Sequence, residues 1–136
     1  IMAWSPLQFG LLSGKFRRGQ ARPSESRLNS LDAPGAFDEE RLYRIVDVLA
    51  EIAAQRGVSI SQVALNWLTR KPGVDTVIIG ARNEGQLSDN LAAANWTLTD
   101  REVESLDEAS ALPLPYPYWH QQKFGGERNP PAKHVR

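Results

Sequence analysis

The sequence has two segments whose residue types suit the binding of an anion. The first runs Trp4-Ser5-Pro6-Leu7 and continues through Gly10-Leu11-Leu12-Ser13-Gly14-Lys15. Glycines let the backbone approach a ligand closely, and Lys15 adds positive charge beside a hydroxyl and free N–H groups. These features suit a pyrophosphate group. An ordinary surface loop fits the same residues, because glycine-containing loops are weak signals when they stand alone.

The second segment is Ile78-Ile79-Gly80-Ala81-Arg82-Asn83-Glu84-Gly85-Gln86. It is an apolar run that leads into a predicted helix, whose N-terminus offers free N–H groups and a partial positive charge to a phosphate. The guanidinium of Arg82 adds a planar fork that binds phosphate through two hydrogen bonds. The alternative is a plain strand-to-helix turn with a solvated arginine. In (β/α)8 barrels the loops after the last two strands often bind phosphate, so the two segments together favour such a site.

Two short strands are predicted in front of these segments. Residues 1–4 form an apolar run that ends at Ser5-Pro6, since proline lacks the N–H that a strand needs. Residues 76–79 are β-branched and apolar on both faces, which is typical of a buried parallel strand. Residues 5–36 are predicted to be a long irregular loop. Two strands cannot close a barrel, and Ile1 opens the chain inside an apolar run, so we expect part of a larger parallel α/β unit, cut within an element.

Four amphipathic helices are predicted from their caps and apolar spacing. The caps are Asp38, Ser59 with Gln62, Asn83 with Gln86, and Thr99 with Glu102, and the last three pairs follow the capping-box pattern. The stripes expected to be buried are Leu42, Ile45, Val46, Leu49, Ile52 and Ala53; Val63, Ala64, Trp67 and Leu68; Leu87, Leu91 and Ala94; and Leu106 with Ala109. The expected hydrophobic staples are Phe37 with Leu42, Val58 with Val63, and Leu98 with Val103. Gly57 is expected to end the first helix in the left-handed conformation.

The composition excludes several classes of site. Lys plus Arg and Asp plus Glu both total 16, and this balance argues against nucleic-acid binding. The absence of Cys excludes disulfides and thiolate metal sites and predicts a cytoplasmic protein. No apolar run approaches the roughly 20 residues of a membrane helix. Residues 59–70 loosely suggest a helix-turn-helix, but a β-branched run follows where a recognition helix is needed.

The end of the chain differs in character from the rest. Prolines stand at positions 113, 115, 117, 130 and 131, so residues 113–136 are predicted to form neither a regular helix nor a sheet. We therefore divide the chain into a segment of residues 1–112 and a Pro- and aromatic-rich tail of residues 113–136.

Three motifs, in this order, resemble the aldo-keto reductases. Residues 4–15 are similar to strand seven of that family and its loop, residues 58–68 to the helix before the last strand, and residues 78–90 to the last strand and the helix that follows. The resemblance covers about residues 1–112 and implies the C-terminal portion of a (β/α)8 TIM barrel. It also implies an oxidoreductase that uses NADPH, with NADH as the alternative, to reduce a small aldehyde or ketone.

The resemblance assigns roles to residues of both segments. It places Trp4 where the family has an aromatic ring stacked on the nicotinamide, although a core aromatic on a barrel strand is the alternative. The loop over the pyrophosphate corresponds to Ser5, Pro6, Leu7, Gly10 and Lys15. The pocket for the adenosine 2′-phosphate corresponds to Gly80, Arg82 and Gln86. Asp89 and Asn90 match positions that contact the ribose or adenine, with a solvated helix carboxylate as the alternative for Asp89.

The resemblance assigns no catalytic residue to this chain. The family's catalytic Asp, Tyr, Lys and His come from the first half of the barrel, so this chain alone is expected to be inactive without that missing N-terminal half. Tyr116, Tyr118 and His120 lie in the tail, where the family shapes its substrate pocket. A non-catalytic nucleotide-binding or regulatory protein of the same fold stays open as the alternative.

Overall fold

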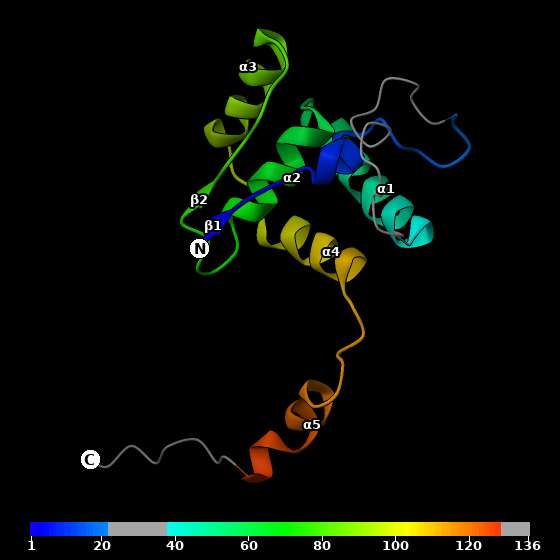
Figure 1. The fold of residues 1–136 in the computed structure, drawn as a ribbon, viewed down its shortest axis with the longest axis vertical. Coiled ribbons are helices and arrows are strands. Elements are labelled where there is room, and N and C mark those ends of the chain that lie inside the picture. Colours follow the sequence, from blue (N-terminus) through cyan, green and yellow to red (C-terminus); the bar gives the residue numbers. More distant parts are fainter. Residues whose placement is uncertain (22–37, 129–136) are drawn as a thin grey trace.

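The structure, a computed structural model, describes residues 1–21 and 38–128 of the chain (Figure 1). Its elements are β1 Met2–Ala3, the 3-10 helix η1 Gln8–Ser13, α1 Glu39–Arg56, α2 Ile60–Thr69, β2 Thr76–Val77, α3 Glu84–Ala92, the 3-10 helix η3 Ala93–Asn95, α4 Asp100–Ser110 and α5 Tyr118–Arg128. The predicted alternation of strands with pairs of helices is confirmed.

The two strands lie side by side and run parallel, as expected. Met2 is opposite Thr76, and Ala3 is opposite Val77. The prediction of a strand over residues 76–79 that is buried on both faces is wrong, because β2 covers Thr76–Val77 and Ile78 is 44% exposed. Burial on both faces needs a layer on each side. In the described part of the chain α2 packs on β2 and β1 is its one strand neighbour, so Ile78 is left uncovered.

The helix N-termini form where the caps were predicted. The side chains of Asp38, Asn83 and Thr99 accept hydrogen bonds from backbone N–H groups in the first turns of α1, α3 and α4, and Thr99 with Glu102 forms a full capping box. Gly57 takes a φ of 65° and ends α1, which confirms its predicted role. The proposed staple of Phe37 falls outside the described residues.

The capping box predicted at α2 is wrong in one half. The Oγ of Ser59 accepts from the N–H of Gln62 at 3.1 Å, so Ser59 is the N-cap. The side chain of Gln62 does not return this bond. It donates to Asp89 and accepts from Trp96, because these distant partners hold it in a buried position.

The main core lies between α1, α2 and α4 and contains Leu49, Ile52, Ala53, Ile60, Val63, Ala64, Leu98 and Leu106. The predicted inward positions of Leu106 and Ala109 are confirmed. The stripe predicted for α3 is wrong, since Leu87, Leu91 and Ala94 are exposed while Asn90 is buried. Polar bonds from α2 to the region of Asp89 and Ala93 fix the rotation of α3 and leave its leucines outward.

Two segments predicted to be irregular contain helices. Within residues 5–36, η1 forms because Leu11 and Phe16 pack into a second buried cluster with Leu42 and Val46 of α1. In the tail, α5 begins directly after Pro117 and continues through a stretch without proline. Proline disfavours a helix at its own position and at the residue before it, so the residues that follow Pro117 are free to form one. Figure 1 shows α5 standing apart from the other helices. No helix in the described ranges is both long and apolar enough to cross a membrane.

An ion pair joins the end of α1 to the start of α4 and makes the stability of the chain depend on pH. Arg56 donates two hydrogen bonds, of 2.6 and 2.5 Å, to the carboxylate of Glu102. The guanidinium of Arg56, with further bonds from Thr99, lowers the pKa of Glu102 to about 2, although burial opposes this shift. A carboxyl group with a lowered pKa stabilises the fold above its ordinary pKa. That contribution is lost as the pH falls toward the folded-state value.

We expect Glu102→Gln to lower the free energy of unfolding at pH 7 by about 2 kcal/mol, since one pKa unit corresponds to about 1.4 kcal/mol and part of the gain is screened by solvent. The difference from the unsubstituted chain should shrink as the pH falls from about 4.5 toward 2. Urea denaturation over this pH range measures it. Glu104→Gln, an exposed position on the same helix, is the matched control, and a gap that stays constant with pH would contradict the assignment.

Candidate functional site

A cleft of about 540 Å³ lies between the loop that follows β1 and the segment that leads from β2 into α3. Every residue that the sequence predicts for the cofactor site lines this cleft: Trp4, Ser5, Pro6, Leu7, Gly10, Lys15, Gly80, Arg82, Gln86, Asp89 and Asn90. The structure therefore brings the two segments that were predicted to bind an anion to one place, although more than sixty positions of sequence separate them.

The loop on one side of the cleft has a strained backbone. Ser5, Gln8 and Phe9 have φ angles of 52°, 47° and 56°, in the left-handed region that residues with a Cβ rarely adopt. Gly10 follows with a φ of 92°. Such residues cost about 1–3 kcal/mol each and gather at ligand sites, where the surroundings hold them in place. The loop is thus shaped in advance for close approach by a ligand.

The cleft holds two cationic side chains that have no partner among the described residues. Most arginines in the described ranges are paired, for example Arg18 with Glu40 and Arg56 with Glu102. The side chains of Lys15 and Arg82 form no hydrogen bond or ion pair with any described residue, and both residues line the cleft. Unpaired cations that face one cleft from two segments favour an anionic ligand.

The turn into α3 is held by two local hydrogen bonds. The side chain of Asn83 accepts from the N–H of Gln86 at 2.9 Å, and the Oε1 of Gln86 accepts from the N–H of Arg82 at 3.0 Å. These bonds fix the backbone at Arg82 but leave its guanidinium free to reach a ligand. Arg82 therefore stands beside a helix N-terminus, where free N–H groups also favour an anion.

Asp89 and Asn90 border the cleft in different ways. Asp89 accepts hydrogen bonds from Ser59 at 2.6 Å and from Gln62 at 2.7 Å, so both of its oxygens are held by α2. Asn90 is 7% exposed, and its side-chain amide makes no hydrogen bond within the described part of the chain. Its amide atoms are not among the buried atoms that lack a partner, so the amide is partly accessible and can bond to water or to a ligand in the cleft.

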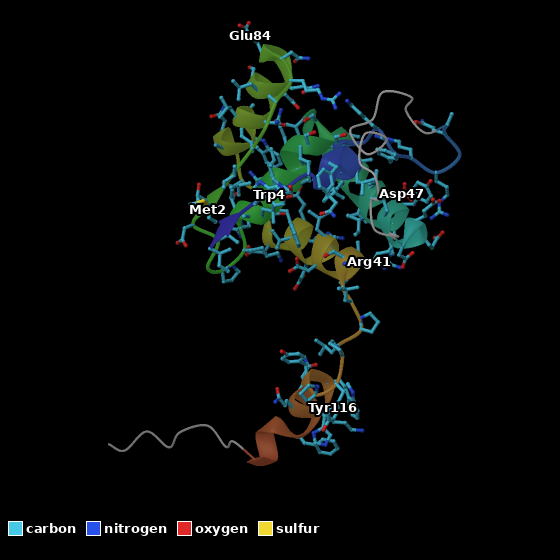
Figure 2. The ribbon with its side chains drawn as sticks, in the orientation of Figure 1. Met2, Trp4, Arg41, Asp47, Glu84 and Tyr116 are labelled. Atoms are coloured by element: carbon cyan, nitrogen blue, oxygen red, sulfur yellow. The ribbon has the colours of Figure 1, made fainter. Side chains whose placement is uncertain are left out.

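Trp4 is 74% exposed at the mouth of the cleft. Figure 2 shows it on the segment that leads from β1 toward η1, and a largely exposed indole has a ring face available for stacking. Tyr116, Tyr118 and His120 do not line the cleft; His120 packs instead on Phe124, with ring centroids 4.7 Å apart. Figure 2 shows Tyr116 with α5, apart from Trp4.

A second cavity, of about 580 Å³, is lined mainly by apolar side chains of α1, α2 and α4. Its charged residues are Asp38, which caps α1, and Arg41, which donates to the carbonyl of Ser110 at 2.6 Å. Only the Nε of Arg41 is left buried without a partner among the described side chains. This cavity lacks the converging polar groups of the first one.

Comparison with known proteins identifies the family. Residues 1–111 match the sequence model of the Aldo/keto reductase family. The chain belongs to the aldo/keto reductase family. The resemblance found in the motifs of the sequence is thereby confirmed.

Several relatives within the aldo/keto reductases match most of this chain. A probable voltage-gated potassium channel subunit beta of Arabidopsis thaliana is 36% identical over 98 residues, which are 70% of this chain and 30% of that protein. The L-glyceraldehyde 3-phosphate reductase of Escherichia coli strain K12 is 35% identical over 114 residues, which are 79% and 32%. An uncharacterized oxidoreductase of Mycobacterium bovis is 40% identical over 114 residues, which are 81% and 33%. The chain spans about a third of the length of these relatives.

Sequence analysis missed the part that α2 of this aldo/keto reductase chain plays at the cleft. Ser59 and Ser61 line it, and Gln62 contacts Asp89 behind it. The pattern of Ser59 and Gln62 was recognised, but only as a local cap. One signal in the sequence was available: α2 has no acidic residue in its first turn. The positive end of the helix is therefore open to a carboxylate from another element.

Proposed function

We propose that this chain is the C-terminal portion of a (β/α)8 barrel and forms part of its site for NADPH, with NADH as the alternative. The whole protein would be an oxidoreductase that reduces a small aldehyde or ketone to an alcohol. Residues 1–112 would form the C-terminal part of the barrel, and residues 113–136 would form the tail that follows it. The observation that carries this proposal is that Lys15 and Arg82, both unpaired in the described chain, line one cleft.

The residues around the cleft fit the parts of such a cofactor. Lys15 and the strained loop beside Ser5 suit a pyrophosphate, which needs positive charge and close backbone approach. Arg82, next to the N-terminus of α3, suits the 2′-phosphate. Asn90 supplies an amide at the wall of the cleft for adenine, and Trp4 an exposed ring for the nicotinamide. Ser5, Pro6, Leu7, Gly10, Gly80, Gln86 and Asp89 complete the proposed lining.

The chemistry itself is assigned elsewhere in the protein. The bound nicotinamide would supply hydride to the carbonyl carbon. No residue of this chain is proposed as the acid that protonates the oxygen, so we expect the 136-residue chain to show no carbonyl reduction by itself. What these residues contribute is binding and orientation of the cofactor.

A second candidate is a non-catalytic nucleotide-binding or regulatory member of the family. The relatives named as potassium channel beta subunits support it, because the same cleft can hold a nucleotide without turnover. Carbonyl-dependent oxidation of NADPH by the whole protein separates the two candidates. Oxidation at catalytic rates favours the reductase, and nucleotide binding without it favours the regulatory protein.

The proposed site predicts that the whole protein binds NADPH and that Lys15→Ala weakens this binding about tenfold or more, since a hydrogen bond to a charged group contributes about 1.5–3 kcal/mol. Isothermal titration calorimetry measures both affinities. Arg101→Ala is the matched control, because the side chain of Arg101 is also exposed and has no partner among the described residues but does not line the cleft. The absence of saturable NADPH binding, or an equal loss in the Arg101 variant, would count against the proposal.

A further inference from the structure

The N-terminus of α2 lies between the two walls of the cleft. On one side, a Cβ added at Gly14 would lie 2.5 Å from Cδ1 of Ile60, so the loop end meets α2 where only a glycine fits. On the other side, Asp89 of α3 accepts hydrogen bonds from Ser59 and Gln62. Since Ser59 also lines the cleft, the first turn of α2 joins the loop that follows β1 to the helix that follows β2.

The bonds to Asp89 complement the positive end of α2. This helix has no acidic residue of its own in the first turn, so the carboxylate of Asp89 takes that place from a neighbouring element. Its Oδ2 accepts from Ser59 at 2.6 Å and its Oδ1 from Gln62 at 2.7 Å. Hydrogen bonds to a charged acceptor are stronger than those between neutral groups. Asp89 is therefore held in one orientation.

Gln62 cannot turn away from Asp89 without breaking a second contact. Its Nε2 donates to Asp89, while its Oε1 accepts from the indole N–H of Trp96 at 3.1 Å. The ring of Trp96 is covered in turn by the guanidinium of Arg56, whose Cζ lies 5.1 Å from the ring centre. With Gln62 only 9% exposed, this arrangement fixes both ends of its amide.

We propose that Ser59 and Gln62 are positioning residues for the adenosine half of the cofactor and act through Asp89. The inference rests on the proposed cofactor site. A carboxylate has about four acceptor positions. Two of these are used by α2, which leaves the others for a ribose hydroxyl or an adenine amino group in the cleft. The same donors hold the carboxylate of Asp89 against α2, so its negative charge repels the cofactor phosphates less.

The test measures binding of 2′,5′-ADP, which carries the adenosine half alone, to the whole protein by calorimetry. We expect Ser59→Ala to weaken binding about tenfold, which corresponds to about 1.4 kcal/mol. Ser59→Thr keeps the hydroxyl and should bind within about twofold of the unsubstituted protein. In the Asp89→Ala background, Ser59→Ala should cause no further loss of affinity, because the positioned group is already gone.

The double-substitution cycle separates positioning from stability. Loss of the Ser59 cap on α2 lowers the melting temperature both with and without Asp89. Loss of positioning lowers the affinity for 2′,5′-ADP only where Asp89 is present. Ser88→Ala is the control, since Ser88 is exposed beside Asp89 and does not line the cleft. An equal affinity loss in both backgrounds, or an unchanged affinity in Ser59→Ala, overturns the inference. Failure of the unsubstituted protein to bind 2′,5′-ADP instead overturns the proposed cofactor site on which the inference rests.

Discussion

Arg82→Ala is expected to weaken NADPH binding by about 10- to 150-fold and to change NADH binding little. The reason is that the guanidinium of Arg82 has no partner within the described chain and lines the cleft beside the N-terminus of α3. A 2′-phosphate there would meet both the guanidinium and free N–H groups. A hydrogen bond to a charged group contributes about 1.5–3 kcal/mol, and each 1.4 kcal/mol corresponds to a factor of ten.

Two neighbours of Arg82, Gln86 and Asp89, can alter the preference for NADPH over NADH. Gln86 is neutral, and its Oε1 is already used by the N–H of Arg82, so it should add less. Asp89 carries a negative charge that would repel a phosphate. Its two oxygens are bound by Ser59 and Gln62, however, which directs the charge toward the positive end of α2.

The measurement compares the affinities of NADPH and NADH for the complete barrel without substitution and with Arg82→Ala, Arg82→Lys or the control Arg101→Ala. Arg82→Lys keeps the charge but loses the planar fork. Its affinity for NADPH should therefore lie between that of the unsubstituted protein and that of Arg82→Ala. Arg101→Ala should leave the ratio of the two affinities unchanged. An equal loss for both cofactors in Arg82→Ala would falsify the assignment of Arg82 to the 2′-phosphate.

The features that the sequence predicted correctly depend on residues close together in the chain. Asp38 and Thr99 cap their helices through bonds to residues three positions later, so the sequence contains both partners of each bond side by side. Gly57 ends α1 because a glycine adopts a left-handed φ at low cost. Some residues of the cleft were predicted from their types alone, whereas Trp4, Asp89 and Asn90 were assigned from the family resemblance. Gly10, Lys15 and Arg82 have types that suit an anion wherever the chain places them.

The features that the sequence did not predict depend on partners far along the chain. Gln62 has the position of a capping-box residue, but Asp89 and Trp96, which lie 27 and 34 positions away, hold its side chain instead. Leu87 and Leu91 have helical spacing, which indicates an apolar stripe without showing which face a neighbouring helix will cover. Polar bonds between α2 and α3 decided that face. Local pattern therefore located the helices but not the rotation of α3.

Asn66 is the clearest case of a distant partner, and its loss is expected to have the largest effect on stability. It lies in α2, is 2% exposed, and was predicted only as part of a family motif. Its Nδ2 donates to the carbonyls of Ala93 at 2.9 Å and Trp96 at 2.6 Å, and its Oδ1 accepts from the N–H of Leu98 at 3.0 Å. One side chain thus satisfies three backbone groups of the connection from α3 to α4.

Asn66→Ala is therefore expected to lower the free energy of unfolding by about 3–6 kcal/mol, because each buried polar group left without a partner costs about 1–3 kcal/mol. Small domains are stable by only about 5–15 kcal/mol, so much of the fold should be lost. Asn66→Asp keeps the acceptor for Leu98 but removes both donors, and its carboxylate would face two carbonyl oxygens. It should be no more stable than Asn66→Ala. Urea denaturation measures the stability of both variants. The control is Asn95→Ala, because Asn95 of η3 is exposed. A similar midpoint for Asn66→Ala and Asn95→Ala would show that the three bonds do not stabilise the connection.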